Sequence, residues 1–159
     1  MSEGVEWALH CCVVLTTSGD PVPAARLAEL HGISGSYLAK HLQQLARSGL
    51  VHSVQGRHSG GYVLTRDAAA ITVLDVVEAL DGDRPAFVCT EIRQRGPLAA
   101  PPEACTRPCA ISRVMNAADK AWRAALAQVT IADLARSVAK DGGPGTLASI
   151  GGWLRKPSE

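Results

Sequence analysis

Two short helical segments separated by a glycine constrain the fold of this chain more than any other feature. Residues 23–31 place two leucines on one helical face, and Gly32 is positioned to end that helix. Ser34 is a typical N-cap residue, and we expect a second helix to run from it to Arg47. A short turn of this kind lets two helices cross while one face of the second helix stays exposed.

Two short β-rich runs follow this helix pair. They cover residues 50–54 and 62–65, and the seven residues between them include three glycines. This pattern predicts a two-stranded antiparallel ribbon closed by a glycine turn. The order helix, turn, helix, ribbon is that of a winged helix-turn-helix, which places its second helix in the major groove of DNA.

The other segments predict a mainly α (α+β) protein. Further helices are expected over residues 5–16 and 72–80, so residues 1–80 form the predicted DNA-binding domain. Residues 81–110 are proline-rich and irregular, and a loop of this length usually has a function. Residues 111–139 predict a long helix with a brief break near Thr130, and the Gly/Pro-rich residues 140–159 are expected to form a flexible tail.

Composition and charge narrow the class of protein. No apolar run approaches the ~18 residues of a membrane helix, and the first residues lack a basic segment followed by a long apolar stretch, so export is not expected. The net charge is only +1, but residues 21–66 carry five Lys or Arg against a single acid, Glu29, and hold four of the five histidines. A basic segment in a neutral chain is a mild indication of nucleic-acid binding.

Candidate DNA contacts lie on the second predicted helix and on the glycine turn. Five side chains of that helix are expected to project outward toward base edges and phosphates: Ser36, Tyr37, Lys40, His41 and Gln44. Arg57 and His58, at the tip of the turn, are placed to reach a minor groove or the backbone. The alternative is that all seven are ordinary surface residues, but element order and charge together favour DNA binding.

The five cysteines fall into two groups. Cys11 and Cys12 lie inside the first predicted helix among apolar residues, where core packing is expected. Cys89, Cys105 and Cys109 lie in the long loop near several arginines, which favour thiolates, so the loop is a candidate metal site. An odd number of cysteines without an export signal argues against a disulfide scaffold.

Glu6 and His10 share a face of the first predicted helix because they are four residues apart. One interpretation is a solvated Glu–His pair that contributes a few tenths of a kcal/mol. The other is a pair of oxygen and nitrogen ligands offered to a metal centre. Their spacing alone does not distinguish the two.

Motifs along most of the chain resemble those of the Rrf-two family of bacterial transcription regulators, which includes iron–sulfur sensors. The matching stretches are residues 33–40, 49–51, 56–64, 71–80, 87–93, 109–111, 121–122 and 130–134. The similarity is greatest to redox-sensing members, through residues 5–12 and the long loop around Arg95-Gly96-Pro97.

This resemblance implies a homodimer in which the long C-terminal helix of each chain crosses to the other chain. It further implies a [2Fe–2S] cluster held by Cys89 and Cys109 of one chain and by Glu6 and His10 of the other. Many relatives use three closely spaced cysteines instead. The wide separation of Cys89 from Cys105 departs from that pattern, which leaves Cys105 as a spare thiol or an alternative ligand.

The sequence therefore predicts a cytoplasmic, dimeric repressor that binds double-stranded DNA at a palindromic operator according to the redox state of its cluster. Trp7, between Glu6 and His10, is a candidate for relaying the redox change. An enzyme is not expected, because no nucleophile–base pair or phosphate-binding loop is evident.

Two alternatives to the cluster remain open. The first is a structural zinc site formed by Cys89, Cys105, Cys109 and His10. The second is a thiol switch without metal, in which Cys105 and Cys109 pair on oxidation.

Overall fold

The computed structural model describes residues 2–56 and 60–156, and the chain forms two compact units. The first unit combines residues 1–82 with residues 126–159, and the second comprises residues 83–125. The predicted DNA-binding domain ends at residue 80, close to residue 82, after which the chain enters the second unit. The C-terminal residues, however, belong to the same unit as the N-terminal ones.

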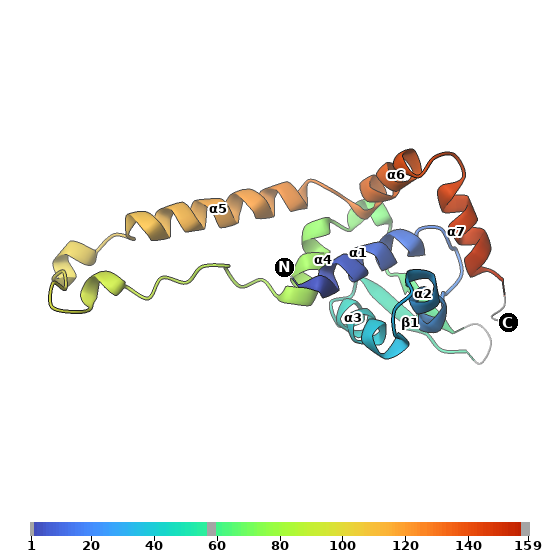
Figure 1. The fold of residues 1–159 in the computed structure, drawn as a ribbon, viewed down its shortest axis with the longest axis horizontal. Helices are drawn as coiled ribbons and strands as arrows, with labels where there is room; N and C mark the ends of the chain where they lie inside the picture. Colours follow the sequence, from blue (N-terminus) through green and yellow to red (C-terminus); the bar gives the residue numbers. More distant parts are fainter. Residues whose placement is uncertain (1, 57–59, 157–159) are drawn as a thin grey trace. The chain divides into compact units, whose positions relative to one another are not determined.

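The first unit is largely helical with one small sheet (Figure 1). Its elements are α1 (Glu3–Leu15), α2 (Ala24–His31), α3 (Gly35–Arg47), β1 (Val51–Val54), β2 (Gly61–Leu64), α4 (Val73–Asp81), α6 (Ile131–Asp141) and α7 (Thr146–Leu154). The predicted helix pair, the ribbon and the helix at 72–80 are thus confirmed to within one residue or so at each end. The predicted fold class, mainly α with a winged helix-turn-helix, is also confirmed.

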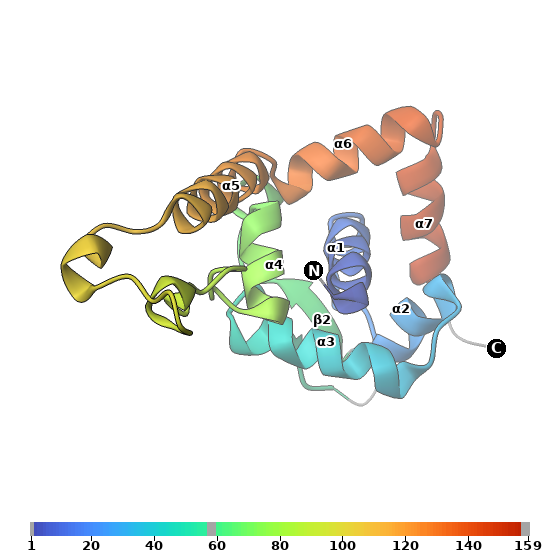
Figure 2. The same cartoon turned by 60° about the vertical axis from the view of Figure 1, so that its left-hand side comes forward.

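Helix α1 lies at the centre of this unit. Figure 2 shows α3, α4, α6 and α7 around it, and all four contact it. Ala8, Cys11 and Cys12 on its inner face are fully buried. Burial raises the pKa of Cys11 and of Cys12 to about 12, and for Cys11 the adjacent Cys12 adds to the shift. Both thiols therefore act as small apolar core residues, as predicted.

Local backbone chemistry sets the helix pair and the ribbon. Gly32 caps α2 with φ 65°, a left-handed conformation that glycine adopts without strain. The Ser34 hydroxyl accepts a hydrogen bond from the backbone N–H of Tyr37 at the start of α3. β1 and β2 are antiparallel, and Val22 extends the pairing by exchanging two backbone hydrogen bonds with Tyr62. The ribbon is thereby attached to the residues that precede α2.

The predicted long helix over residues 111–139 is instead two helices. The first, α5 (Ala110–Ala127), belongs almost entirely to the second unit, and α6 follows after a break. At the break, Thr130 accepts from the backbone N–H of Asp133, and the Asp133 carboxylate accepts from the N–H of Thr130. This reciprocal capping box starts a new helix at Ile131, so the brief interruption expected near Thr130 is a full boundary.

The prediction of a flexible tail is also wrong for residues 146–154, which form α7. Gly143 and Gly145 adopt positive φ and turn the chain back after α6. Gly151 then packs closely against Thr17, leaving no room for a larger side chain. Arg26 of α2 is only 6% exposed: its guanidinium lies 3.6 Å from the centre of the Trp153 ring and donates to the Trp153 carbonyl at 2.7 Å. These contacts hold α7 against α2.

The second unit consists of an irregular loop and α5. The loop contains two single 3₁₀ turns, η2 (Ile92–Gln94) and η3 (Pro102–Cys105). Arg123 of α5 joins the beginning and the end of this unit's chain. It pairs with Asp119 and donates to the carbonyls of Asp83 and Arg84. In the part of the chain that the structure describes, no helix combines the length and the apolar character that crossing a bilayer requires.

We predict that Trp153→Ala destabilises the first unit by about 2–3 kcal/mol, because it removes a half-buried aromatic ring and the cation–π contact of the buried Arg26. Urea unfolding followed by circular dichroism measures this change. Ser149→Ala, at an exposed position of the same helix, is the matched control. Equal stability of the two variants would contradict the docking role of α7.

Candidate functional site

Cys89, Glu91 and Cys109 form a cluster of metal-ligating atoms in the second unit. The two Sγ atoms and a Glu91 carboxylate oxygen all lie within 4.8 Å of one another, and all three residues are half-buried. The Cys89 thiol donates to Oε1 of Glu91 at 3.2 Å, and Cys109 Sγ accepts from the backbone N–H of Ser112 at 3.3 Å. The structure thus brings together two of the predicted ligands and adds Glu91, which the sequence analysis did not include.

Arg93 connects the two arms of the loop that carry these cysteines. It pairs with Glu91 at 2.7 Å and donates to the carbonyl of Arg107, two residues before Cys109, at 3.0 Å. Glu91 itself has φ 49°, a left-handed conformation that is unusual outside glycine. Its backbone turn returns the carboxylate toward Cys89 and Arg93.

The electrostatics of this cluster stabilise negative charge on one sulfur. The N–H of Ser112, in the first turn of α5, lowers the pKa of Cys109, with a further contribution from Arg93. Hydrogen bonding from Cys89 and then from Arg93 lowers the pKa of Glu91. The backbone N–H of Glu91 lowers the pKa of Cys89. The Glu91 carboxylate, desolvation and Cys109 outweigh this contribution, so the pKa of Cys89 is raised overall.

Apolar side chains surround the two thiols. An open pocket of about 480 Å³ beside them is lined by both cysteines together with Phe87, Val88, Ile92 and Ile111. Val88, Ile92 and Ile111 are 71%, 73% and 67% exposed, and Leu98 further along the loop is 95% exposed. An exposed apolar surface of this extent is typical of a protein–protein interface.

Cys105 is not part of the cluster. It ends η3 and is half-buried, but its sulfur does not join the group of ligand atoms within 4.8 Å. It also does not line the pocket beside the other two thiols.

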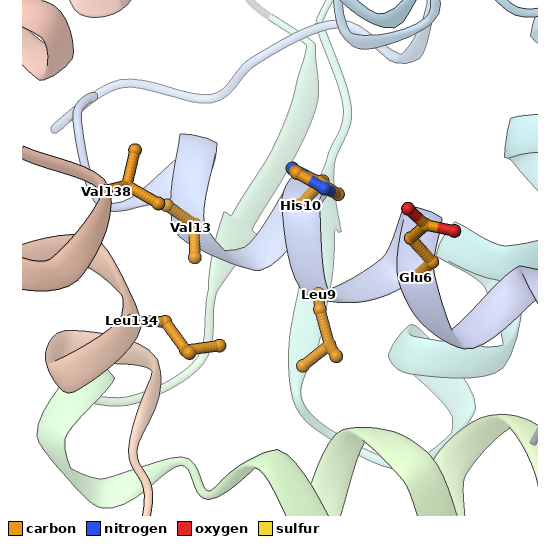
Figure 3. A pocket seen from close by; sticks show the side chains of 6 residues that line it. All are labelled: Glu6, Leu9, His10, Val13, Leu134 and Val138. Atoms are coloured by element: carbon orange, nitrogen blue, oxygen red, sulfur yellow. The ribbon is translucent and has the colours of Figure 1, made fainter. Parts of the chain in front are cut away.

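Glu6 and His10 lie on α1 in the first unit. Figure 3 shows the two side chains one turn apart on the same side of the helix. Both help to line an open groove of about 220 Å³. Leu9, Val13, Leu134 and Val138, from α1 and α6, line the rest of this groove. Both Glu6 and His10 are exposed. The four predicted ligands therefore form two pairs, one in each unit.

Trp7 and His10 both adjoin His31, the last residue of α2. The ring centre of His31 lies 6.0 Å from that of Trp7 and 5.8 Å from that of His10. Burial, and then the nearby His10, lower the pKa of His31. Among the described residues, Nε1 of Trp7 and Nε2 of His31 have no hydrogen-bond partner.

The predicted DNA-contact residues of α3 divide into two groups. Ser36 and Lys40 are exposed, as expected, and Tyr37 is half-buried with its ring edge-on to His41 at 4.8 Å. The expected outward direction is wrong for His41, whose ring packs against Gly4 of α1, and for Gln44, which donates to the carbonyl of Leu80 of α4. Helices α1 and α4 cover this part of α3.

Two further polar residues of α3, Gln43 and Arg47, are exposed and were missed by the sequence analysis. Their positions three and seven residues after Lys40 could have indicated that they share its face. Arg57 and His58, predicted at the tip of the ribbon, lie outside the described residues.

A family model described as "Rrf2: Iron-dependent Transcriptional regulator" matches residues 1–137. The chain belongs to the Rrf2 family. This confirms the resemblance to the Rrf-two family, and the family description is that of a transcriptional regulator and not of an enzyme, as predicted. The match ends before α7.

Among Rrf2 relatives, the chain is 43% identical over 77 residues to the "HTH-type transcriptional regulator IscR" of Escherichia coli. That alignment covers 48% of this chain and 47% of the relative, so the chain spans about half the length of the curated relatives it matches.

Solved structures share the Rrf2 fold. The CymR (YrzC) global cysteine regulator of B. subtilis aligns with TM-score 0.63 and 24% identity, over 86% of this chain and 96% of that one. The T. potens IscR aligns with TM-score 0.65 and 21% identity, over 91% of each chain. At these identities the likeness establishes the fold alone.

We predict that the protein loses stability as pH falls below about 6.5, because unfolding then lets His31 take up a proton that the folded environment disfavours. The sign follows from the lowered pKa: this contribution is complete above the unfolded pKa and declines as pH falls through it. Urea unfolding between pH 7.5 and pH 5 measures it, and His31→Gln should flatten the slope. His52→Gln, on the exposed side of β1, is the control; an equal slope in all three proteins would contradict this assignment.

Proposed function

We propose that this Rrf2 protein is a homodimeric, redox-responsive DNA-binding regulator that acts as a repressor in the cytoplasm. In this proposal a [2Fe–2S] cluster is held by Cys89 and Cys109 of one chain and by Glu6 and His10 of the partner subunit. When bound, such a cluster supplies one-electron redox chemistry, at a potential that imidazole ligation raises, as in Rieske centres.

One observation carries the proposal: the predicted ligands form two pairs, each open on one side. Cys89 and Cys109 face an open apolar pocket, and Glu6 and His10 stand exposed at the edge of a groove on α1. Each pair supplies two of the four ligands that the proposal requires, and Glu91, the third ligand-type side chain beside the thiols, is paired with Arg93. Two copies of the chain related by a two-fold axis would therefore complete two equivalent sites.

The side chains beside the thiols fit an anionic cluster better than a bare zinc ion. The Arg93 guanidinium lies close enough to Cys105 and Cys109 to interact electrostatically with both, and its buried Nε has no hydrogen-bond partner among the described residues. A fixed cation with a spare donor stabilises bound negative charge and disfavours a dication. The zinc alternative also requires Cys105, which lies outside the ligand cluster.

Helix α1 contacts both helices of the helix-turn-helix. Its first turn abuts α3, because a methyl group at Gly4 would overlap the His41 ring, and His41 in turn meets Tyr37. Its second and third turns reach the end of α2 through Trp7, His10 and His31. A displacement of α1 is therefore passed to the helix that we propose to enter the major groove. These contacts support Trp7 as a relay between α1, which carries Glu6 and His10, and the helix-turn-helix formed by α2 and α3.

In this proposal the dimer presents two α3 helices to a palindromic operator. Ser36, Tyr37 and Lys40, with Gln43 and Arg47, form the proposed contact face, and Arg57 and His58, which lie outside the described residues, are further proposed contacts. In this proposal His41 and Gln44, which contact Gly4 of α1 and Leu80 of α4, position α3 on the DNA.

We predict that Cys89→Ala and Cys109→Ala each abolish the visible absorption of the protein purified without oxygen, because each removes one of two cluster thiolates from every site. Cys105→Ala should retain most of it, and Cys11→Ala should reduce stability while sparing the cluster. Visible spectra with iron and sulfide analysis provide the measurement. A colourless wild-type protein that contains zinc would overturn the proposal, and loss of colour in Cys105→Ala would overturn the ligand set.

We predict that Lys40→Ala weakens DNA binding and reduces the slope of log affinity against log salt concentration by roughly one unit, as expected for one lost phosphate contact. A DNA fragment selected from a random pool by the wild-type protein serves as the probe. Lys120→Ala, an exposed lysine of α5, is the matched control. Equal affinity and slope in both variants would remove α3 from the DNA interface.

A further inference from the structure

The two cluster thiols are already close together in the absence of any metal. Cys89 Sγ and Cys109 Sγ lie within 4.8 Å of each other on opposite arms of the loop, and both are free thiols. Arg93 keeps the arms together by binding Glu91 on one arm and the Arg107 carbonyl on the other. A disulfide bond is about 2.05 Å long, so the two sulfurs need to approach each other by less than about 3 Å to form one.

The surroundings make the two sulfurs chemically unequal. Cys109 Sγ accepts the Ser112 N–H at the start of the 18-residue helix α5, where the backbone N–H groups favour negative charge. Cys89 instead donates its proton to Glu91. The first arrangement favours a sulfur that attacks an oxidant, and the second favours a thiol that resolves the product. The open pocket beside both residues admits a small oxidant.

We propose that the cluster-free protein is a peroxide-responsive dithiol in which Cys89 and Cys109 of one chain form a disulfide. The inference extends the proposed function, since the same two residues would serve as cluster ligands. It differs from the thiol switch considered from the sequence, in which Cys105 pairs with Cys109.

The reaction balances with a peroxide as the oxidant. The deprotonated sulfur of Cys109 attacks one oxygen of hydrogen peroxide, the O–O bond breaks, and Cys109 becomes a sulfenic acid while hydroxide leaves and takes up the proton that Cys109 had released. The Cys89 sulfur then attacks the sulfur of Cys109 and breaks its S–O bond, and the Cys89 proton passes through Glu91 to the leaving hydroxyl group, which departs as water. Overall, two thiols and one peroxide give one disulfide and two waters.

The disulfide has a direct consequence for the metal site. Both sulfurs are consumed in the bond, so neither is free to bind iron until a reductant restores the thiols. The oxidised chain is therefore locked in a cluster-free state. Because Arg93 already joins the two arms, closing the bond requires little rearrangement of the loop.

The test uses the full chain, freed of metal and reduced, and then titrated with hydrogen peroxide without oxygen. Alkylation in denaturant should show the count of free thiols falling from five to three, with recovery after dithiothreitol. Mass spectrometry of the digested wild-type protein should find the peptide containing Cys89 joined to the one containing Cys109. Non-reducing electrophoresis should show a single chain. Cys105→Ser should form the bridge as readily as wild type, whereas Cys89→Ser should not form it.

Three results would overturn the inference: five remaining thiols, a bridge between Cys105 and Cys109, or a covalent dimer. The wild-type measurement does not depend on the folding of any variant. It is also independent of the proposed cluster, because it is made on metal-free protein. A bridge in a protein that never acquires visible absorption would sink the proposed function alone, and a coloured protein without a bridge would sink this inference alone.

Discussion

Helix α1 is fixed in the first unit by the burial of one of its faces. Ala8, Cys11 and Cys12 are fully enclosed by the surrounding helices, so α1 cannot move as a free element. The opposite face carries Glu6 and His10, which are exposed and, among the described residues, belong to no group of three or more metal-ligating side chains. A helix held this firmly transmits force well, because a close-packed interior yields little when one element shifts. This combination makes α1 suited to connect a ligand site with the helices that meet DNA.

The second unit is held together by polar contacts more than by a buried apolar core. It buries little apolar surface, and Val88, Ile92 and Leu98 remain largely exposed. Order in its loop comes mainly from polar contacts, above all the Arg93 links to Glu91 and to the Arg107 carbonyl. Polar contacts at the surface contribute modestly to stability, so we expect the loop to depend on association with a second chain. The proposed dimer would bury these exposed apolar side chains and would also complete the set of four ligands.

Local features of the sequence predicted local structure well. Gly32 and Ser34 define the turn between α2 and α3 through their own backbone chemistry, and Thr130 with Asp133 marks the start of α6 in the same way. Helix α7 was missed because its docking depends on Arg26 and Trp153, which are 127 residues apart in the chain. No window of sequence contains both partners.

The site was predicted only in part, because some of its contacts also join residues that are far apart in the sequence. Cysteine spacing and the family resemblance supplied Cys89 and Cys109, and the structure brings them together. His41 was expected to face outward because helical periodicity defines which residues share a face, but not that Gly4 of a neighbouring helix covers that face. Glu91 was missed because its approach to Cys89 requires a left-handed backbone conformation that a glutamate seldom adopts. A carboxylate two residues after a loop cysteine was the only available signal.

A metal site shared between two chains can be restored by mixing two variants that each lack part of it. One variant lacks both helix ligands (Glu6→Ala with His10→Ala), and the other lacks one thiol (Cys89→Ala). The two are unfolded together in equal amounts and refolded with iron and sulfide without oxygen. Shared ligation predicts that each heterodimer regains one complete site, so that visible absorption returns to about a quarter of the wild-type value for random pairing. Ligation within a single chain predicts a mixture as colourless as either parent, and that result would contradict the account.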